Sequence, residues 1–348
     1  MKVRSGRQQS ASDRWQELAQ EAEFETRIVD VYRSDILEQL RDCCGFMWWF
    51  HQRERHLGKR IVFSIEQALR IPVFPDWKTA WHFDDKVGQR YLLDAAGIPA
   101  PRTWIFWNHE EALEFCRQAK YPIVLKLTRG AVSQNVKLVA DRTEAEFWVS
   151  NMFGEGVDSL DKWPRPPIGW RELRKRLGGA RRMLLGQPLQ RVFASLERGY
   201  VLFQEFLPGN EFDTRISVIG DRAFAFRRHN RPGDFRASGS GRIDWDHTQI
   251  PPEKVNLAFR AARTLQSQCL AMDILHAADR SLSVNEVSCY FEFWAVEACP
   301  GHWRADGTWV SGAMKAEDAV FQSFIEQVRK FARTNSPLDA PPPASAVV

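Results

Sequence analysis

Several features that mark common classes of protein are missing from this sequence. No apolar run approaches the length of a membrane-spanning helix, and the first 25 residues are polar and charged, without the apolar segment of a signal peptide. We therefore expect a soluble, cytoplasmic protein with no membrane partner. The first strand–helix turn carries no glycine-rich fingerprint, so a dinucleotide-binding role has no support.

Cysteine pairs with the spacing of a metal site are also missing. The chain has no C-x-x-C pair and no regular spacing between cysteine and histidine, and the neighbours Cys43 and Cys44 are poorly placed for a disulfide. We expect reduced packing residues and no zinc site. The cysteines are Cys43, Cys44, Cys116, Cys269, Cys289 and Cys299.

Aromatic and charged residues, by contrast, are present in an uneven distribution. At 348 residues, with 14 Trp and 23 Phe, the chain is long enough for two or three lobes with wide aromatic burial. Its net charge is +4, but residues 162–191 hold nine basic residues against the single acid Glu172, which gives this segment +8 and the rest −4. A basic flap over phosphates has this composition, and so does a solvated helix. With Trp163 and Trp170, the segment also suits stacking on nucleic-acid bases, although the modest net charge makes nucleic acid an unfavoured partner.

The pattern along the chain predicts a small α/β lobe followed by a longer α+β region. Strands at 27–31, 45–50 and 71–74 alternate with helices at 34–43 and 58–70, which indicates a partly parallel sheet in residues 1–80. Further helices are predicted at 13–23, 85–96, 108–119, 253–270 and 316–332. Period-two alternation predicts mostly antiparallel strands at 122–128, 135–140, 200–207, 214–219, 222–229, 271–275 and 282–287. Residues 335–348, rich in Pro and Ala, are predicted to be a disordered tail.

Lys126 is the first residue that suggests chemistry. It lies in the middle of an apolar strand, where an ammonium group is costly unless it meets an anion. The loop of small and polar residues at 129–135 follows at once, and its backbone N–H groups suit a phosphate. Glu205 lies in a second apolar strand, where a carboxylate can accept a hydrogen bond from an adenine amino group beside the backbone of Phe206 and Leu207. An ordinary edge-strand glutamate has the same pattern.

Arginines gather on the next two strands. Asp213, Arg215 and Ser217 share a face, and Arg227 and Arg228 follow on the neighbouring strand, before a Gly/Ser-rich stretch. Because a guanidinium binds phosphate or carboxylate with two parallel hydrogen bonds, this clustering favours an anion site, although solvated arginines remain an alternative.

Two acids form the sharpest pattern. A hairpin centred between Asp279 and Arg280 would place Asp273 opposite Glu286. Facing carboxylates repel unless a cation lies between them, and oxygen ligands of this kind suit Mg²⁺. A misplaced turn would separate the two acids.

Taken in order, these stretches resemble the ATP-grasp superfamily, which includes glutathione synthetase, D-alanine–D-alanine ligase and the ribosomal-protein glutamate ligases. The matching segments begin at Asp85-Lys86 with Leu92-Leu93 and 96–99, and continue through 121–126, 201–206 and Asp213-Thr214-Arg215 to Asp273 and Glu286. The resemblance implies an ATP-grasp fold of the α/β (α+β) class, with antiparallel sheets clamping ATP. It places a pre-ATP-grasp lobe at 1–80 and the ATP-grasp domain at 81–334, divided into an ATP-binding part at about 81–205 and a metal-binding part at about 206–334.

The resemblance also implies roles for individual residues. Lys86 and Lys126 would hold the ATP phosphates, and the loop that includes Gly130 and Ser133 would close over them. Glu205, Phe206 and Leu207 would take the adenine, and Asp213 would approach the ribose or a phosphate. Asp273, Glu286 and Ser288 would hold Mg²⁺, with Mn²⁺ as a substitute. Arg236 would lie near the transferred phosphate, and Arg215 would be a second catalytic residue.

Ser288 departs from the family pattern. The family usually has Asn two residues after the metal-binding Glu, and a hydroxyl is a shorter and weaker ligand than an amide carbonyl. The departure predicts a less tightly held second metal ion or reduced activity, and it leaves a catalytically weakened ATP-binding protein as an alternative.

These inferences lead to one functional hypothesis and its alternatives. We expect an ATP-dependent carboxylate–amine ligase that makes an amide or peptide-like bond through an acyl phosphate. Its substrates would be a small carboxylate and an amine, or a peptide. A kinase of the same fold with a hydroxyl acceptor, or a nucleic-acid-binding protein that uses residues 162–191, would be the alternatives. Residues 290–294 and 301–304 suit an acceptor pocket, plain core or a subunit contact, and the oligomeric state, a homo-oligomer included, stays open.

Overall fold

The computed structural model describes residues 11–130, 135–158, 196–335 and 345–347. The chain divides into two compact units. The first comprises Met1–Phe83, Leu92–Ala100 and Gly209–Val348, and the second comprises Asp84–Tyr91 and Pro101–Pro208. The boundary falls inside helix α5 (Lys86–Ala95), whose first six residues belong to the second unit.

A small parallel sheet forms one part of the first unit. Its strand order is β1-β17-β2-β3, and neighbouring strands run parallel, as predicted for this lobe. The strands are β1 (Glu25–Arg27), β17 (Ser345–Val347), β2 (Cys43–Met47) and β3 (Val73–Phe74). The helices are α1 (Ala11–Glu21), α2 (Ile36–Gln39), α3 (Arg55–Ser64) with a π-helical turn at Ile65–Leu69, and α4 (Trp77–Ala80).

A large antiparallel sheet forms the rest of the first unit. Its strand order is β14-β13-β10-β11-β15-β16, and β12 pairs with β11. The strands are β10 (Phe212–Ile219), β11 (Arg222–His229), β12 (Ile243–Asp244), β13 (Cys269–His276), β14 (Leu282–Ser288), β15 (Gly301–Arg304) and β16 (Trp309–Ser311). The helices are η2 (His247–Gln249), α9 (Pro252–Thr264), α10 (Phe293–Glu297) and α11 (Ala316–Asn335).

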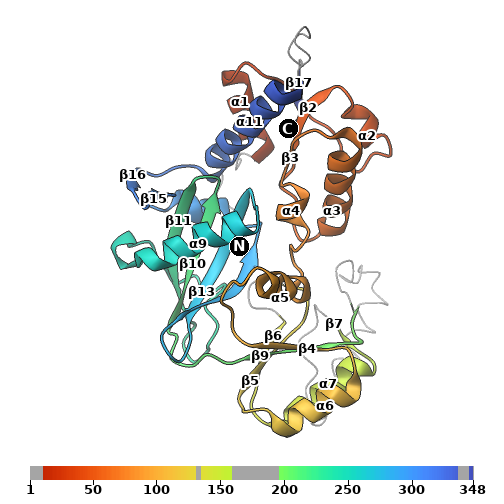
Figure 1. Cartoon of the computed structure of the whole chain (residues 1–348), viewed down its shortest axis with the longest axis vertical. Coiled ribbons are helices and arrows are strands. Elements are labelled where there is room, and N and C mark those ends of the chain that lie inside the picture. The colour runs from red at the N-terminus through yellow and green to blue at the C-terminus, as the bar shows by residue number, and fades with distance from the viewer. Residues whose placement is uncertain (1–10, 131–134, 159–195, 336–344, 348) are drawn as a thin grey trace, which may run out of the picture. The chain divides into compact units, whose positions relative to one another are not determined.

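The two faces of this sheet bury different partners. Side chains alternate along each strand, so Ile216 and Val218 join a core with the apolar face of α9, which Figure 1 shows beside β10. On the opposite face, Ile219 and Phe224 pack into a second core with residues from α10, α11 and the small parallel sheet. Residues 1–80, which were predicted as a lobe of their own, therefore share a hydrophobic core with the large sheet.

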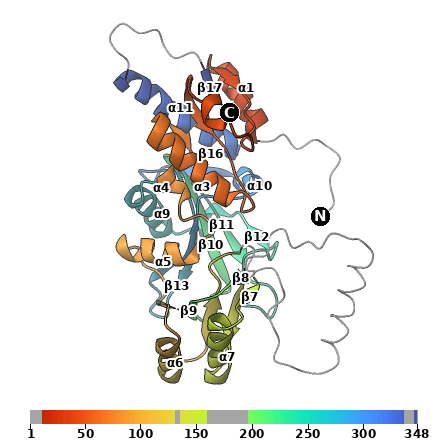
Figure 2. The ribbon, with the colours of Figure 1, turned by 90° about the vertical axis from the view of Figure 1, so that its right-hand side faces the viewer.

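The second unit is a four-stranded antiparallel sheet with helices on it. The strand order is β4-β9-β5-β6, and Figure 2 shows α6 and α7 side by side. Its elements are β4 (Thr103–Phe106), α6 (His109–Gln118), β5 (Ile123–Lys126), β6 (Val136–Val139), α7 (Arg142–Phe153), β7 (Val157–Asp158), β8 (Leu196–Glu197) and β9 (Val201–Glu205). Asn108 caps α6, because its side chain accepts hydrogen bonds from the N–H groups of Glu110 and Glu111.

Several predicted elements need correction. The helix predicted at 253–270 ends at Thr264, and Cys269 already belongs to β13. The strand predicted at 27–31 is displaced to Glu25–Arg27. In the predicted disordered tail, Ser345–Val347 forms strand β17 between β1 and β2, and the helix before it continues to Asn335. Pattern analysis missed α7 and β4.

Two further expectations can be compared with the described residues. All six cysteines are free and buried, as expected for reduced packing residues. None of the helices in the described part of the chain combines the length and apolar character needed to cross a membrane.

Candidate active site

The predicted site residues fall into two groups, one in each unit. Most residues assigned to ATP (Lys86, Lys126, Gly130, Glu205, Phe206 and Leu207) belong to the second unit. Asp213, which was also assigned to the nucleotide, belongs to the first unit, as do the residues assigned to metal binding and catalysis (Arg215, Arg236, Asp273, Glu286 and Ser288). Ser133 and the basic residues 162–191 lie outside the described residues.

Lys86 contacts the start of the predicted phosphate loop. Its ammonium donates a hydrogen bond to the carbonyl oxygen of Gly130 at 2.8 Å, and its backbone N–H donates to Thr128 at 2.9 Å. The N–H of Gly130 donates to the carboxylate of Asp84, also at 2.8 Å. Gly130 has a φ of 120°, a conformation that favours glycine. Lys86 bonds to its carbonyl and Asp84 to its N–H, so these two side chains fix the start of the loop.

Lys126 is buried at the end of β5. Its exposed fraction is 6%, and Ile123, Leu125 and Leu127 lie in the core of the unit, as the alternation predicted. The N–H of Leu127 donates to the carbonyl of Asn135 at 3.0 Å, which closes the base of the loop. Lys86 and Lys126 therefore both lie next to the ends of this loop.

A buried tyrosine supports the same loop, and pattern analysis missed it. The N–H of Thr128 donates to the hydroxyl of Tyr200 at 2.7 Å, and that hydroxyl donates to Glu197 at 2.8 Å. Arg129 lies 3.7 Å from the Glu197 carboxylate. Burial and the neighbouring Glu197 raise the pKa of Tyr200, so the hydroxyl keeps its proton. No local signal could have found this contact because Thr128 and Tyr200 lie 72 positions apart in the chain.

The residues predicted to bind adenine lie at the end of β9. Glu205 is its last residue and is half-buried, and Leu207 is buried. The Glu205 backbone N–H donates to the Arg102 carbonyl at 2.8 Å, and its carboxylate accepts a longer bond of 3.4 Å from the Arg102 N–H. The adenine assignment of Glu205, Phe206 and Leu207 stays a prediction.

In the first unit, the cross-strand acid pair is present. Asp273 on β13 is the direct partner of Glu286 on β14, as the hairpin prediction required. Beyond this pair the register shifts by one, so that Ile274 faces Val284 and Asn285 is the extra residue of a β-bulge. The bulge lies directly beside the acidic pair.

The positive charge that the pair needs comes from two guanidinium groups. Arg215 donates two hydrogen bonds to Asp273, at 2.7 and 2.8 Å, and Arg228 donates a third at 2.7 Å. Arg228 also donates two bonds to Asp213, at 2.8 and 2.6 Å. Four charges thus form a continuous chain on one face of the sheet, in the order Asp213, Arg228, Asp273 and Arg215.

Burial and pairing shift the pKa values of the two acids in opposite directions. Burial would raise the pKa of Asp273, but Arg215 and Arg228 outweigh it and hold that pKa well below its usual range. Burial dominates at Asp213 and raises its pKa in spite of Arg228. The predicted approach of Asp213 to the nucleotide has no support here, because its carboxylate is buried against Arg228.

The remaining candidates have local partners. Arg236 is bonded to Asp234, with Nη2 and Oδ2 2.6 Å apart, and Arg227 is paired with Asp244. Ser288 accepts a hydrogen bond from the N–H of Tyr290 at 3.0 Å. In the predicted acceptor segment, Phe291 lies in the core, and Tyr290 and Phe293 pack against it.

The donor set suits one oxygen-coordinated cation. A carboxylate has about four lone-pair positions. Among the residues that the structure describes, Oδ1 of Asp273 accepts one hydrogen bond, from Arg215, and so keeps acceptor capacity. Asp273 is the cross-strand partner of Glu286. Among the described residues, no group of three or more His, Cys, Asp or Glu side chains is arranged to hold a metal ion. A site formed by Asp273 and Glu286 would therefore depend on oxygens from its ligand or water, which is usual for Mg²⁺.

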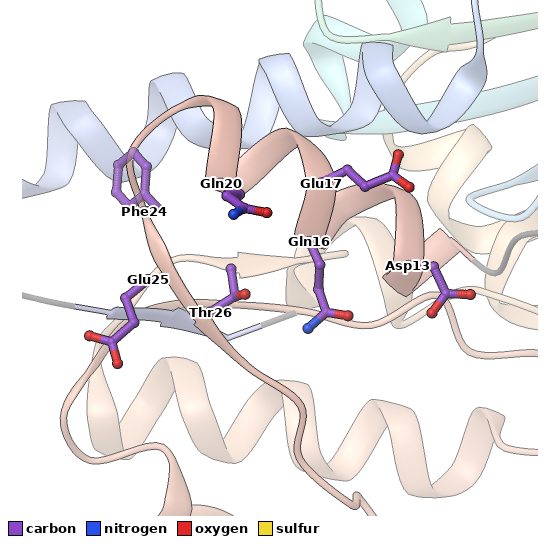
Figure 3. Close-up of a pocket in the computed structure, with 7 residues that line it drawn as sticks. All are labelled: Asp13, Gln16, Glu17, Gln20, Phe24, Glu25 and Thr26. Atoms are coloured by element: carbon purple, nitrogen blue, oxygen red, sulfur yellow. The ribbon is translucent and has the colours of Figure 1, made fainter.

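A separate hollow lies on the surface of the first unit. It has a volume of about 490 Å³ and lies between α1 and the start of β1, as Figure 3 shows. The residues that line it are Asp13, Gln16, Glu17, Gln20, Phe24, Glu25 and Thr26. None of the predicted site residues is among them.

The sequence matches known proteins over most of its length. The model of the RimK-like ATP-grasp domain matches residues 185–297, which include Asp213, Arg215, Asp273 and Glu286. An alpha-aminoadipate–LysW ligase, LysX, from Sulfurisphaera tokodaii is 22% identical over 79% of this chain and 86% of its own length. The enzyme of the same name from Saccharolobus solfataricus is 23% identical over 69% of this chain and 74% of its own length.

A solved structure agrees with the fold. N5-carboxyaminoimidazole ribonucleotide synthetase from Thermotoga maritima superposes with a TM-score of 0.50 and 13% identity, covering 90% of this chain and 64% of that one. This likeness concerns the fold alone. Together with the mixed α+β architecture and the antiparallel sheet in each unit, it shows that the chain has an ATP-grasp fold, and residues 185–297 are those that match the RimK-like ATP-grasp domain.

Proposed function

We propose that this protein is an ATP-dependent ligase that joins a carboxylate to an amine through an acyl phosphate. The observation that carries the proposal is the pairing of Asp273 with Glu286 across two strands, with Arg215 and Arg228 bonded to Asp273. This group combines anionic oxygens for a metal ion with guanidinium groups for a phosphate or carboxylate, the two needs of phosphoryl transfer to a carboxylate. It lies within the RimK-like match.

The second unit supplies the nucleotide contacts in this proposal. Lys86 and Lys126 bind the phosphates of ATP, with backbone N–H groups of the loop that starts at Gly130. Glu205, Phe206 and Leu207 receive the adenine. Tyr200 and Glu197 do not touch ATP, but hold Thr128 and Arg129 at the start of the loop.

Asp273 and Glu286 hold Mg²⁺ in this proposal, and Mn²⁺ can replace it. A bound divalent ion neutralises phosphate oxygens and draws charge from the transferred group. Ser288 is a weak third candidate because its hydroxyl already accepts a hydrogen bond from Tyr290.

The protein's own residues act by positioning and by charge. An oxygen of the substrate carboxylate attacks the γ-phosphorus, the bond to ADP breaks, and an acyl phosphate forms. The amine then attacks the carbonyl carbon, phosphate leaves with the oxygen that came from the carboxylate, and the amine loses a proton. Arg215 binds anionic oxygen during these steps and Arg236 acts at the transferred phosphate, so no protein nucleophile is required.

The substrates are a small carboxylate and an amine, or a peptide that carries one of these groups. Alpha-aminoadipate is the first compound to test because the two LysX relatives carry it in their names. We place the enzyme in the cytoplasm, where ATP is supplied.

The experiment that tests this function measures ADP and free phosphate in one assay. The purified protein receives Mg-ATP with alpha-aminoadipate and other amino-acid carboxylates, each with and without an amine or peptide acceptor. We expect equal amounts of ADP and phosphate only when both partners are present, together with an amide product detected by mass. A stable phosphorylated product with ADP but no free phosphate would instead identify a kinase of the same fold.

A further inference from the structure

Arg215 and Arg228 share one carboxylate but differ in what else holds them. Arg228 donates two bonds to Asp213 and one to Asp273, so a second acid keeps it in place. Arg215 donates both of its bonds to Asp273, which is its sole hydrogen-bonded acid among the described residues. Loss of the Asp273 contact would therefore free Arg215 but leave Arg228 fixed.

Arg215 and Arg228 also differ in the exposed fraction of their side chains. The side chains of Arg228 and Asp213 are each 8% exposed, whereas that of Arg215 is 19% exposed. Arg215 is thus at the outer end of the network, where its guanidinium can turn to water without remaining as a buried charge. Asp273 has 4% of its side chain exposed and would keep only Arg228 as a partner, so the loss of Arg215 is costly unless another cation takes its place.

We propose that Arg215 is an exchangeable counter-ion of Asp273, which a divalent cation displaces and which then binds the anionic oxygen of the substrate. Arg228 and Asp213 are positioning residues in this scheme, because they keep the Asp273 carboxylate in place while the exchange occurs. With Glu286 included, the five side chains carry a net charge of −1 in their usual ionised forms, which favours a dication. The arriving dication then repels the Arg215 guanidinium toward an anion. The identity of that anion rests on the proposed function, whereas the exchange itself does not.

Removal of Arg215 is expected to strengthen metal binding, unlike most substitutions at a binding site. If metal and Arg215 compete for Asp273, removal of Arg215 must tighten metal binding. If Arg215 only stabilises the carboxylate geometry, its removal must weaken metal binding or leave it unchanged. The sign of the change therefore separates the two roles.

Electron paramagnetic resonance of Mn²⁺, titrated into the full-length protein without nucleotide or substrate, measures this sign. We expect Arg215→Met to lower the Kd for Mn²⁺ about five- to twentyfold, since a unit charge in contact with the ligand is removed. Asp273→Asn is expected to raise the Kd at least about tenfold, which locates the site. Arg222→Met is the matched control, because Arg222 lies on the same strand as Arg228 but is paired with Asp221, and its Kd should stay within about twofold.

An unchanged or higher Kd in folded Arg215→Met protein would overturn the proposal. Arg215→Lys keeps the charge but cannot form the two-bond fork, and it should tighten Mn²⁺ binding by a smaller factor. If circular dichroism shows that Arg215→Met does not fold, the Kd of Arg215→Lys decides whether Arg215 competes with the metal ion.

A second titration tests the released guanidinium, with sulfate as the probe anion. Wild-type protein saturated with Mn²⁺ should bind sulfate more tightly than metal-free protein, and Arg215→Met should lose most of this gain. An equal gain in both proteins would contradict the substrate-binding half of the proposal. If removal of Arg215 tightens Mn²⁺ binding and abolishes the gain in sulfate affinity but the protein makes no amide, only the ligase assignment is refuted. If the protein is an active ligase without these two effects, only the exchange is refuted.

Discussion

At the scale of single residues, the burial of Lys126 is the observation that most favours the proposed phosphate contact. The residue is 6% exposed at the end of β5, beside the loop that begins at Gly130. Lysine is rarely buried to this degree without an anionic or hydrogen-bonding partner. The position suits a group that binds phosphate in a partly dry environment, where a charge-assisted contact is strong.

Replacement of this side chain tests the assignment. We expect Lys126→Met to raise the Kd for Mg-ATP about ten- to a hundredfold, measured by isothermal titration calorimetry, because a charge-assisted bond contributes about 1.5–3 kcal/mol. Lys137→Met is the matched control, since Lys137 is on the neighbouring strand and is paired with Glu144 at 3.0 Å. Equal losses in the two variants would remove Lys126 from the nucleotide site.

The residues around Asp273 show which contacts could be predicted from the sequence and which could not. The facing positions of Asp273 and Glu286 agree with the prediction, but the predicted turn register is wrong by one residue: next to the turn Ile274 faces Val284, and the β-bulge at Asn285 restores the predicted pairing at Asp273. The bonds from Arg215 and Arg228 could not be predicted, because they depend on β10 lying between β11 and β13, a strand order that periodicity does not contain. The same holds for Asp84 and Gly130, which are 46 positions apart.

At the scale of elements, one strand and one helix show why some bounds could be predicted and others could not. The strand at 222–229 has its predicted bounds because Gly220 and Asp221 form a tight turn before it. Helix α9 was predicted too long because its end carries no glycine. The chain leaves the helix at Gln266, which has a φ of 52°, and the N–H groups of Gln266 and Ser267 bond to Arg263 and Ala262 at 3.1 and 3.0 Å. This is a Schellman motif with glutamine where glycine is usual.

The motif predicts a stabilising substitution. Gln266→Gly removes the steric cost of a side chain in the left-handed region, which is about 1 kcal/mol, whereas Gln266→Ala retains it. Both variants lose the hydrogen bond from Lys78 to the Gln266 side chain, so the comparison isolates the backbone effect. In urea denaturation, the glycine variant should exceed the alanine variant by about 1 kcal/mol in unfolding free energy. Equal stabilities would show that the turn does not strain Gln266.

At the scale of the whole molecule, the predicted site residues are divided between two units. Lys86 and Lys126 belong to one, and Asp273 and Glu286 to the other. The sequence predicted both groups because each is carried by a local pattern. It did not reveal that residues 1–80 share a core with the large sheet, because that packing joins segments more than a hundred positions apart.

One buried histidine makes the stability of the folded protein depend on pH. His82 is fully buried, and burial, with a smaller effect of Lys59, lowers its pKa to about 4 from the ordinary 6.5. Above pH 6.5 the residue is neutral in both folded and unfolded chains and has no effect. As pH falls from 6.5 toward 4, the unfolded chain binds the proton first, so this residue reduces the unfolding free energy by about 1.4 kcal/mol per pH unit.

Urea denaturation at a series of pH values measures this contribution. We expect the wild-type protein to lose about 2 kcal/mol more than His82→Asn between pH 6.5 and 5. His109→Asn, at a half-buried position on α6, is the matched control. If His82→Asn and the wild-type protein showed the same slope, His82 would not be the titrating group.

The transfer of carboxylate oxygen tests the central claim, the acyl phosphate, most directly. The protein is incubated with Mg-ATP, an amine acceptor and a carboxylate substrate labelled with ¹⁸O in both carboxyl oxygens, and the released phosphate is examined by ³¹P NMR. An acyl phosphate predicts that each phosphate carries one ¹⁸O and that the amide keeps the other. Amide formation with unlabelled phosphate would contradict the account.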